Sequence, residues 1–137
     1  MARKTFNKSL YAKYDEQAKQ ATWKALESRG YSVANNPNKY AQDLLANKGD
    51  KSFCVECEVK AVWKGENFPY GSVQLPERKK KFFDKPTLFF IWNNNLTRAV
   101  LFWDHHVTDL EPVEVPNKYL DREEKFFQIP LSRVKFI

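Results

Sequence analysis

The stretch SFCVECEVKAVWK, residues 52–64, decides the fold of this 137-residue chain. Apolar side chains recur through it, and the polar Glu56, Glu58 and Lys60 stand at alternate positions between them. Successive side chains of a β-strand point to opposite faces of a sheet, so these three groups would share one face. The pattern predicts a long central strand over 52–64. Its alternative explanation is a solvated face of an antiparallel sheet.

The residues before this strand predict a helix and two shorter strands. Tyrosine and alanine recur at spacings of four, three and four between positions 14 and 25, which predicts a helix over 14–29. A short strand is expected at 31–34 and another at 40–47, which contains Asp43. The turn sequence KGDK at 48–51 joins that strand to the long one and predicts a hairpin.

The residues after the long strand predict a basic helix and two apolar strands. Pro76 suits the first turn of a helix over 76–83. Residues 87–92 are apolar enough for a strand buried on both faces, and 98–103 predict a further strand. The remainder, 104–137, is expected to be loop-rich, with a short helical or extended stretch near 120–127 and a terminal piece at 134–137.

This order of elements predicts an α/β fold. We expect a single domain over residues 1–137, with a core at about 14–103 and a loop-rich C-terminal extension. Its mixed central β-sheet has an α-β-β-β-α-β core flanked by helices, and the early strands form an antiparallel meander.

Composition limits the partners and the compartment. The formal net charge of +6 favours a polyanionic partner. The sequence contains no apolar run of about 18 residues and no apolar signal region at its start, so we expect no membrane association and a cytoplasmic location. The lone pair Cys54 and Cys57 is expected to stay reduced, because strand residues three apart face opposite sides.

Three residues carry a resemblance to a known family. They are Asp43 in YAQDLLANK, and Glu58 and Lys60 in CEVKAVW. With the order of helix, strand, Asp-bearing strand, E-x-K strand and helix, the chain resembles the PD-(D/E)XK nuclease superfamily over residues 14–92. Its small size is similar to that of phage-type or resolvase-like members. The residue before Asp43 is Gln42, where the family pattern has proline.

The resemblance implies a restriction-endonuclease-like fold and a metal-dependent endonuclease that acts on DNA. Asp43 and Glu58 would bind Mg²⁺, or Mn²⁺ as a substitute, with the backbone carbonyl of Val59 as a further ligand. Lys60 would assist the attacking water. Glu56 shares the face of Glu58 and is a candidate second carboxylate, since Mg²⁺ prefers hard oxygen ligands.

Some members of the superfamily add an acid from the first helix. Glu16 and Glu27 are the candidates here, but both fall opposite the expected apolar stripe. His105 and His106 are adjacent, and adjacent strand residues diverge, so we do not expect them to share one ion.

The basic helix is expected to contact nucleic acid. Its candidate contacts are Gln74, Arg78, Lys79 and Lys80, because cations there would neutralise phosphates. A homodimer is compatible with this function, since cutting both strands commonly uses two copies of one site. The alternatives are a non-catalytic nucleic-acid-binding module of the same fold and a protein-interaction domain.

Overall fold

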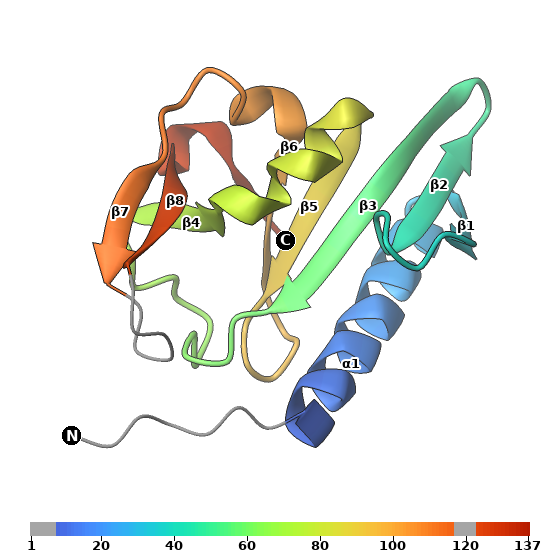
Figure 1. Ribbon diagram of the computed structural model, residues 1–137. Coiled ribbons are helices and arrows are strands. Elements are labelled where there is room, and N and C mark those ends of the chain that lie inside the picture. The colour runs from blue at the N-terminus through green and yellow to red at the C-terminus, as the bar shows by residue number, and fades with distance from the viewer. Residues whose placement is uncertain (1–7, 117–122) are drawn as a thin grey trace.

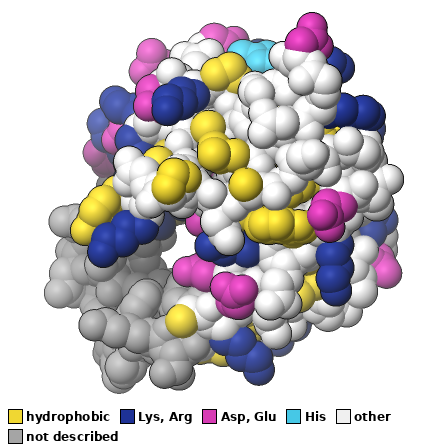
Figure 2. Space-filling model, turned by 90° about the vertical axis from the view of Figure 1, so that its right-hand side faces the viewer, with side chains coloured by type: hydrophobic (Ala, Val, Ile, Leu, Met, Phe, Trp, Pro, Cys, Tyr) yellow, Lys and Arg dark blue, Asp and Glu magenta, His cyan; other side chains and the backbone are white. Residues whose placement is uncertain are grey.

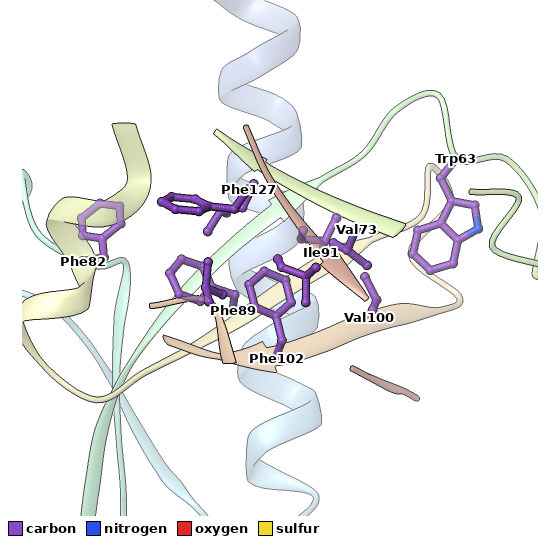
Figure 3. Packing of buried hydrophobic residues seen from close by; sticks show 11 residues of the cluster. Trp63, Val73, Phe82, Phe89, Ile91, Val100, Phe102 and Phe127 are labelled. Atoms are coloured by element: carbon purple, nitrogen blue, oxygen red, sulfur yellow. The ribbon is translucent and has the colours of Figure 1, made fainter. Parts of the chain in front are cut away.

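Two β-sheets and one long helix form three layers, with the larger sheet in the middle (Figures 1 and 3). The computed structural model describes residues 8–116 and 123–137. The helical elements are α1 (Lys8–Glu27) and the 3₁₀ helices η1 (Glu77–Asp84), η2 (Asp104–His106) and η3 (Leu131–Arg133). The strands are β1 (Ser32–Asn35), β2 (Leu44–Lys48), β3 (Lys51–Val59), β4 (Ser72–Pro76), β5 (Thr87–Trp92), β6 (Ala99–Trp103), β7 (Val113–Pro116), β8 (Glu123–Pro130) and β9 (Lys135–Phe136).

The central sheet is mixed, as predicted. Its strand order is β1-β2-β3-β5-β6-β9, and β3 pairs with β5 in parallel whereas its other pairs are antiparallel. The expected meander of β1, β2 and β3 is therefore confirmed, and so is the hairpin turn between β2 and β3, where Gly49 has φ +62°. The connection from β3 to β5 contains β4 and η1.

Helix α1 begins earlier than predicted, and its expected apolar stripe faces the sheet in part: Ala18 is buried, and Ala21 and Ala25 are partly buried against the helix-facing core. The prediction began at residue 14, but the helix begins at Lys8. Its buried residues are Ala18, Thr22 and Leu26, spaced by four. Thr22 belongs to this face because its hydroxyl accepts a hydrogen bond from the indole N–H of Trp92 at 2.9 Å. Counting apolar residues alone missed this polar position.

The loop-rich expectation for 104–137 is wrong. This segment contributes β7, β8 and β9, and β7 and β8 join β4 in a second sheet of order β4-β8-β7. The prolines that suggested loops stand at strand ends, where the missing N–H interrupts no ladder: Pro116 closes β7 and Pro130 closes β8. Of the stretch expected near 120–127, residues 117–122 lie outside the described ranges and the rest is extended.

The element after β4 is also tighter than predicted. The expected helix over 76–83 is the 3₁₀ helix η1, and the strand β4 before it was not predicted. By contrast, all six residues of β5 are buried, which confirms the strand predicted at 87–92.

The central sheet has an apolar core on each face. Phe89, Ile91 and Phe102 meet Val73 and Phe127 of the second sheet on one face (Figure 3). The other face packs against α1. Val55 and Cys57 of β3 belong to the helix-facing core, so Glu56 and Glu58 point to the opposite face by the alternation of the strand.

No helix in the described ranges combines the length and the apolar character that crossing a bilayer requires.

Candidate carboxylate–lysine site

Asp43 lies close to Glu56. Leu44 pairs with Val55 at the end of the β2–β3 ladder, and Asp43 precedes Leu44 as Glu56 follows Val55. The strand predicted at 40–47 begins only at Leu44, and Asp43 immediately precedes it. The Asp43 carboxylate nevertheless extends the ladder, because its Oδ2 accepts a hydrogen bond from the backbone N–H of Cys57 at 3.1 Å.

Gln42 fixes the backbone that carries Asp43. This side chain is 3 % exposed. Its amide donates to the carbonyl of Phe82 at 3.2 Å and to the hydroxyl of Thr87 at 3.0 Å. A buried glutamine with these partners ties the start of β2 to η1 and β5, which gives a physical reason for glutamine at this position.

Glu56 is a strongly perturbed carboxyl of the site. It is 8 % exposed, and Lys79 donates to its Oε2 at 2.7 Å. Its Oε1 is buried and has no hydrogen-bond partner among residues 8–116 and 123–137. Burial raises the pKa of Glu56 to about 8, the nearby Asp43 carboxyl adds to this, and the Lys79 ammonium opposes it. A buried carboxyl with one orphan oxygen beside a second carboxyl is costly unless a cation or proton compensates it.

Glu58 stands two residues farther along the same face. Burial raises its pKa, while Lys79 and then Lys60 lower it. Lys60 itself lies just after the end of β3, and its ammonium is 4.9 Å from the centre of the Tyr70 ring. The structure therefore brings Asp43 together with Glu56 and Lys79, and it places the predicted partners Glu58 and Lys60 one strand repeat or more away.

An acidic residue of α1, Asp15, lies within electrostatic range of this site. Partial burial raises the pKa of Asp15, and the Asp43 carboxylate is the next cause, while Lys79 lowers it. Asp15 precedes the buried Ala18 by three residues, so it flanks the true buried face of α1. Glu16 instead lines a hollow on the outer side of the helix, with Trp23.

The four residues predicted to bind nucleic acid point in different directions. Gln74 is in β4 opposite Gln128. Arg78 forms an ion pair with Glu124 of β8 at 2.6 Å, and the exposed Lys80 lines a separate hollow. Only Lys79 forms an ion pair with a carboxylate of the site. Successive residues of a 3₁₀ helix are about a third of a turn apart, which separates them.

Acidic and basic side chains stand next to one another around a recess on the side of the molecule that carries β1 and β2 (Figure 2). Within the described ranges, no three His, Cys, Asp or Glu side chains are close enough to hold a metal ion by themselves. Mg²⁺ is commonly bound through one or two carboxylates, with waters and substrate phosphates completing its shell. The facing pair Asp43 and Glu56, with the orphan oxygen of Glu56, fits such a site. Val59, the predicted carbonyl ligand, is the last residue of β3, beyond Glu58.

The remaining chemical side chains have structural partners. Both cysteines are free and buried, as expected, and burial raises the pKa of each thiol. His106 accepts a hydrogen bond from the backbone N–H of Trp103 at 3.1 Å through Nδ1, so this nitrogen is not free to bind a metal.

No protein-family model matches this chain, and no curated protein matches it.

Proposed function

We propose that the protein is a metal-dependent nuclease of the PD-(D/E)XK type, with a restriction-endonuclease-like fold, that hydrolyses phosphodiester bonds in DNA. The observation that carries the proposal is the cluster of Asp43, Glu56 and Lys79, in which a buried carboxylate oxygen lacks a partner. The topology supports it: a helix is followed by a meander whose third strand is acidic and pairs in parallel with β5.

In this proposal the two facing carboxylates hold a Mg²⁺ ion. The ion, when bound, acidifies a water and neutralises charge that develops on the phosphate. Asp43 is oriented for this role by the N–H of Cys57, and Glu56 is oriented by Lys79. From its place beside Glu56, the Lys79 ammonium would donate to a phosphate oxygen or to the attacking water. Glu58 adds a third carboxylate from the same face for water-mediated contacts.

The charge balance of the site suits an anionic substrate. Arg78 lies near enough to Glu58 to lower its pKa, and Lys60 does the same from the end of β3. Both cations therefore border the acidic face where a phosphate would approach. Each phosphate that they neutralise adds salt-dependent affinity.

The proposal is tested by cleavage of plasmid, single-stranded and branched DNA with Mg²⁺, with an RNA of matched sequence in parallel. Asp43→Asn and Glu56→Gln should each lower the rate by about 100-fold or more, because each removes a charged ligand without changing volume. Glu16→Gln, a matched change on the outer side of α1, should leave the rate unchanged. If Asp43→Asn and Glu56→Gln both cleave like the parent, the proposed site is wrong.

A non-catalytic nucleic-acid-binding module is the second candidate. It is favoured by the ion pair between Lys79 and Glu56, which neutralises the site without a metal. Such a module should show salt-sensitive binding and no product with either Mg²⁺ or Mn²⁺. A nuclease should bind DNA with Ca²⁺ and cleave it only when Mg²⁺ or Mn²⁺ replaces it.

A further inference from the structure

A row of aromatic side chains crosses the central sheet on the same face as α1. Phe53 of β3 contacts Tyr31 and Trp103 edge to face, with ring centres 5.4 and 4.9 Å apart. Trp103, at the end of β6, lies nearly parallel to the ring of His105 at 6.2 Å. Tyr31, Phe53 and Trp103 are only half-buried and His105 is exposed, so the row reaches the surface.

Two neighbouring hollows follow this row. One, of about 430 Å³, is lined by Tyr31, Phe53 and Trp103 together with the hairpin residues 50–52 and Pro86. The other, of about 280 Å³, shares residues 52, 53 and 86 with it and adds Lys85, Leu45 and Cys54. Leu44 and Val55 belong to the helix-facing core, so Leu45 and Cys54 point to the opposite face, and this smaller hollow extends to that side of the sheet. The groove on the side of α1 is therefore the larger hollow, whose walls are the three aromatic rings and Pro86 and whose polar groups come from the β2–β3 turn. The larger hollow has the size of a site for a small planar group.

The rim of the groove is predominantly basic. Lys51 lines the groove, Lys85 immediately precedes Pro86 of its wall, and both lysines are exposed. The ammonium of Lys48 lies 5.2 Å from the centre of the Tyr31 ring, which adds a third cation. Asp50 is the acid among the lining residues. Half-exposed rings between cations are the chemistry that binds single-stranded nucleic acid, because bases stack on the rings while phosphates meet the lysines.

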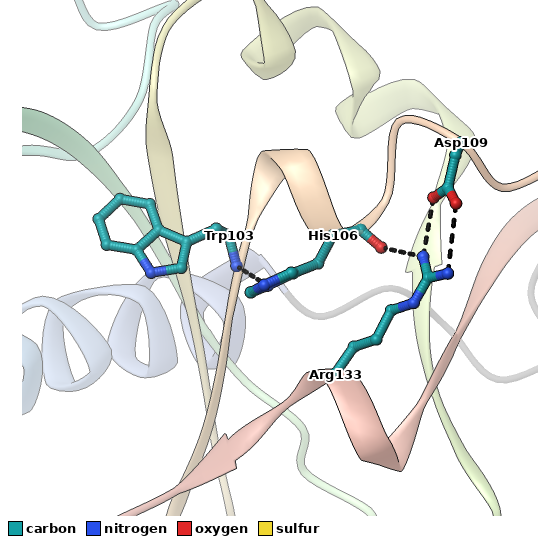
Figure 4. Close-up of polar contacts among 4 residues, drawn as sticks. All are labelled: Trp103, His106, Asp109 and Arg133. Carbon is teal, nitrogen blue, oxygen red and sulfur yellow. Dashed lines mark hydrogen bonds and ion pairs between the residues drawn. The ribbon is translucent and has the colours of Figure 1, made fainter.

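Hydrogen bonds hold Trp103 in place before any ligand arrives. Its backbone N–H donates to Nδ1 of His106, and Arg133 donates to the carbonyl of His106 at 3.0 Å (Figure 4). Arg133 also donates to both carboxylate oxygens of Asp109, at 2.7 and 3.2 Å. These bonds fix the backbone at Trp103, and the indole ring is positioned by its contacts with the rings of Phe53 and His105. A ring positioned before binding costs less ordering entropy on binding.

We propose that this groove binds a single strand of nucleic acid, with bases stacked on Trp103 and Phe53 and phosphates beside Lys51 and Lys85. The proposal rests on the proposed function in taking nucleic acid as the partner. The groove is distinct from the carboxylate site, because Phe53 belongs to the helix-facing core and Glu56 points to the opposite face. A substrate with an unpaired strand next to a duplex would engage both.

The test is fluorescence anisotropy of a labelled oligothymidylate with the full chain in EDTA, where hydrolysis cannot contribute. Trp103→Leu and Phe53→Leu should each weaken binding at least about fivefold, the lower end of what stacking one base provides. Trp103→Phe keeps a ring and should bind within about twofold of the parent, which guards against a folding defect in Trp103→Leu. Trp23→Leu removes a half-buried indole from α1, outside the groove, and should bind like the parent.

Three results would contradict the proposal that this groove binds a single strand. In the first, Trp103→Leu binds the oligothymidylate as tightly as the parent does, and in the second, Trp103→Leu and Trp23→Leu lose affinity equally. In the third, light scattering shows that Trp103→Leu dissociates a dimer while the affinity is unchanged. The last would mean that a second copy covers this face. The result is independent of hydrolysis, because Asp43→Asn should keep the oligothymidylate affinity and Trp103→Leu should keep cleavage of duplex plasmid. If the parent cleaves nothing but shows the stacking loss, the nuclease proposal fails and the groove stands.

Discussion

Burial of Glu56 makes the stability of the folded protein depend on pH, and the sign of this effect can be worked out. The Glu56 pKa of about 8 in the folded protein lies above the ordinary value of 4.5. The folded state therefore keeps a proton that the unfolded state loses. This contribution to stability is complete below about pH 4.5 and is lost as the pH rises through about 8.

We therefore predict that, without divalent cations, the free energy of unfolding of the parent falls between pH 5 and pH 8. Glu56→Gln, which cannot ionise, should flatten this slope by about 1–3 kcal/mol over the same range. Urea unfolding at pH 5, 6.5 and 8 measures the effect, with Glu16→Gln as the control that keeps the slope of the parent. Equal slopes for the parent and Glu56→Gln would contradict the assignment.

The two lysines of the site make different contacts, which separates their roles. Lys79 forms an ion pair with Glu56, whereas the Lys60 ammonium lies beside the Tyr70 ring. We predict that Lys79→Met lowers Mg²⁺-dependent cleavage by about 10²–10⁴-fold, as for loss of a group that transfers or orients a proton.

Lys60→Met and Arg78→Met are the matched comparisons for Lys79→Met. Each removes one cation from the border of the site. Each should lower the cleavage rate by less than about tenfold at moderate salt, because cations at the border contribute mainly a screened attraction for phosphates. Single-turnover rates with saturating protein measure all three. If Lys60→Met lowers the cleavage rate more than Lys79→Met does, the catalytic lysine is Lys60 of the E-x-K triplet and not Lys79.

At the scale of elements, α1 is positioned on the sheet by one polar contact inside an apolar face. The Thr22 hydroxyl accepts from the Trp92 indole, and both side chains are buried. We predict that Thr22→Val, which keeps the shape and removes the acceptor, lowers the free energy of unfolding by about 1–3 kcal/mol.

Thr108→Val is the control for Thr22→Val, because Thr108 is exposed and the same change there should cost less than about 0.5 kcal/mol. Chemical unfolding followed by tryptophan fluorescence and by circular dichroism measures both. If Thr22→Val is as stable as Thr108→Val, the indole N–H has another acceptor and the contact does not position α1.

The elements that could be predicted were those whose own residues decide them. Strand β5 is apolar throughout, and the β2–β3 hairpin has a glycine in its turn, so both could be read locally. Strand β4 could not be predicted in this way. Its two buried residues, Val73 and Leu75, are identified as strand residues only by the pairing of β4 with β8, far along the chain. The alternation of buried and half-buried residues along the five residues of β4 does not specify which strand pairs with it.

The candidate site shows the same division between local and distant information. Asp43 and the acidic face of β3 followed from spacing, but the ladder register that sets Asp43 against Glu56 did not. Lys79 reaches the site because the connection between β3 and β5 passes over this face, and Asp15 comes within electrostatic range of it because α1 packs against β3. Neither position is specified by residues near it in the sequence.

For the whole molecule, a ligand that binds only the folded state must add to its stability. Asp43 precedes β2 and Glu56 lies in β3, so the unfolded chain does not hold them together, and Mg²⁺ should bind the folded protein selectively. At a Mg²⁺ concentration 100 times its dissociation constant the gain is about 2.7 kcal/mol, which corresponds to a rise of several degrees in the melting temperature.

This rise should be larger at pH 8 than at pH 6, because the ion must displace the proton that Glu56 retains at low pH. Asp43→Asn and Glu56→Gln should abolish it, whereas Trp103→Leu, on the other face of the sheet, should keep it in full. Thermal unfolding with and without Mg²⁺ at both pH values is the measurement. An equal shift in the parent and in Asp43→Asn would mean that the ion binds elsewhere, and the facing carboxylates would then be explained by their proton and by Lys79 alone.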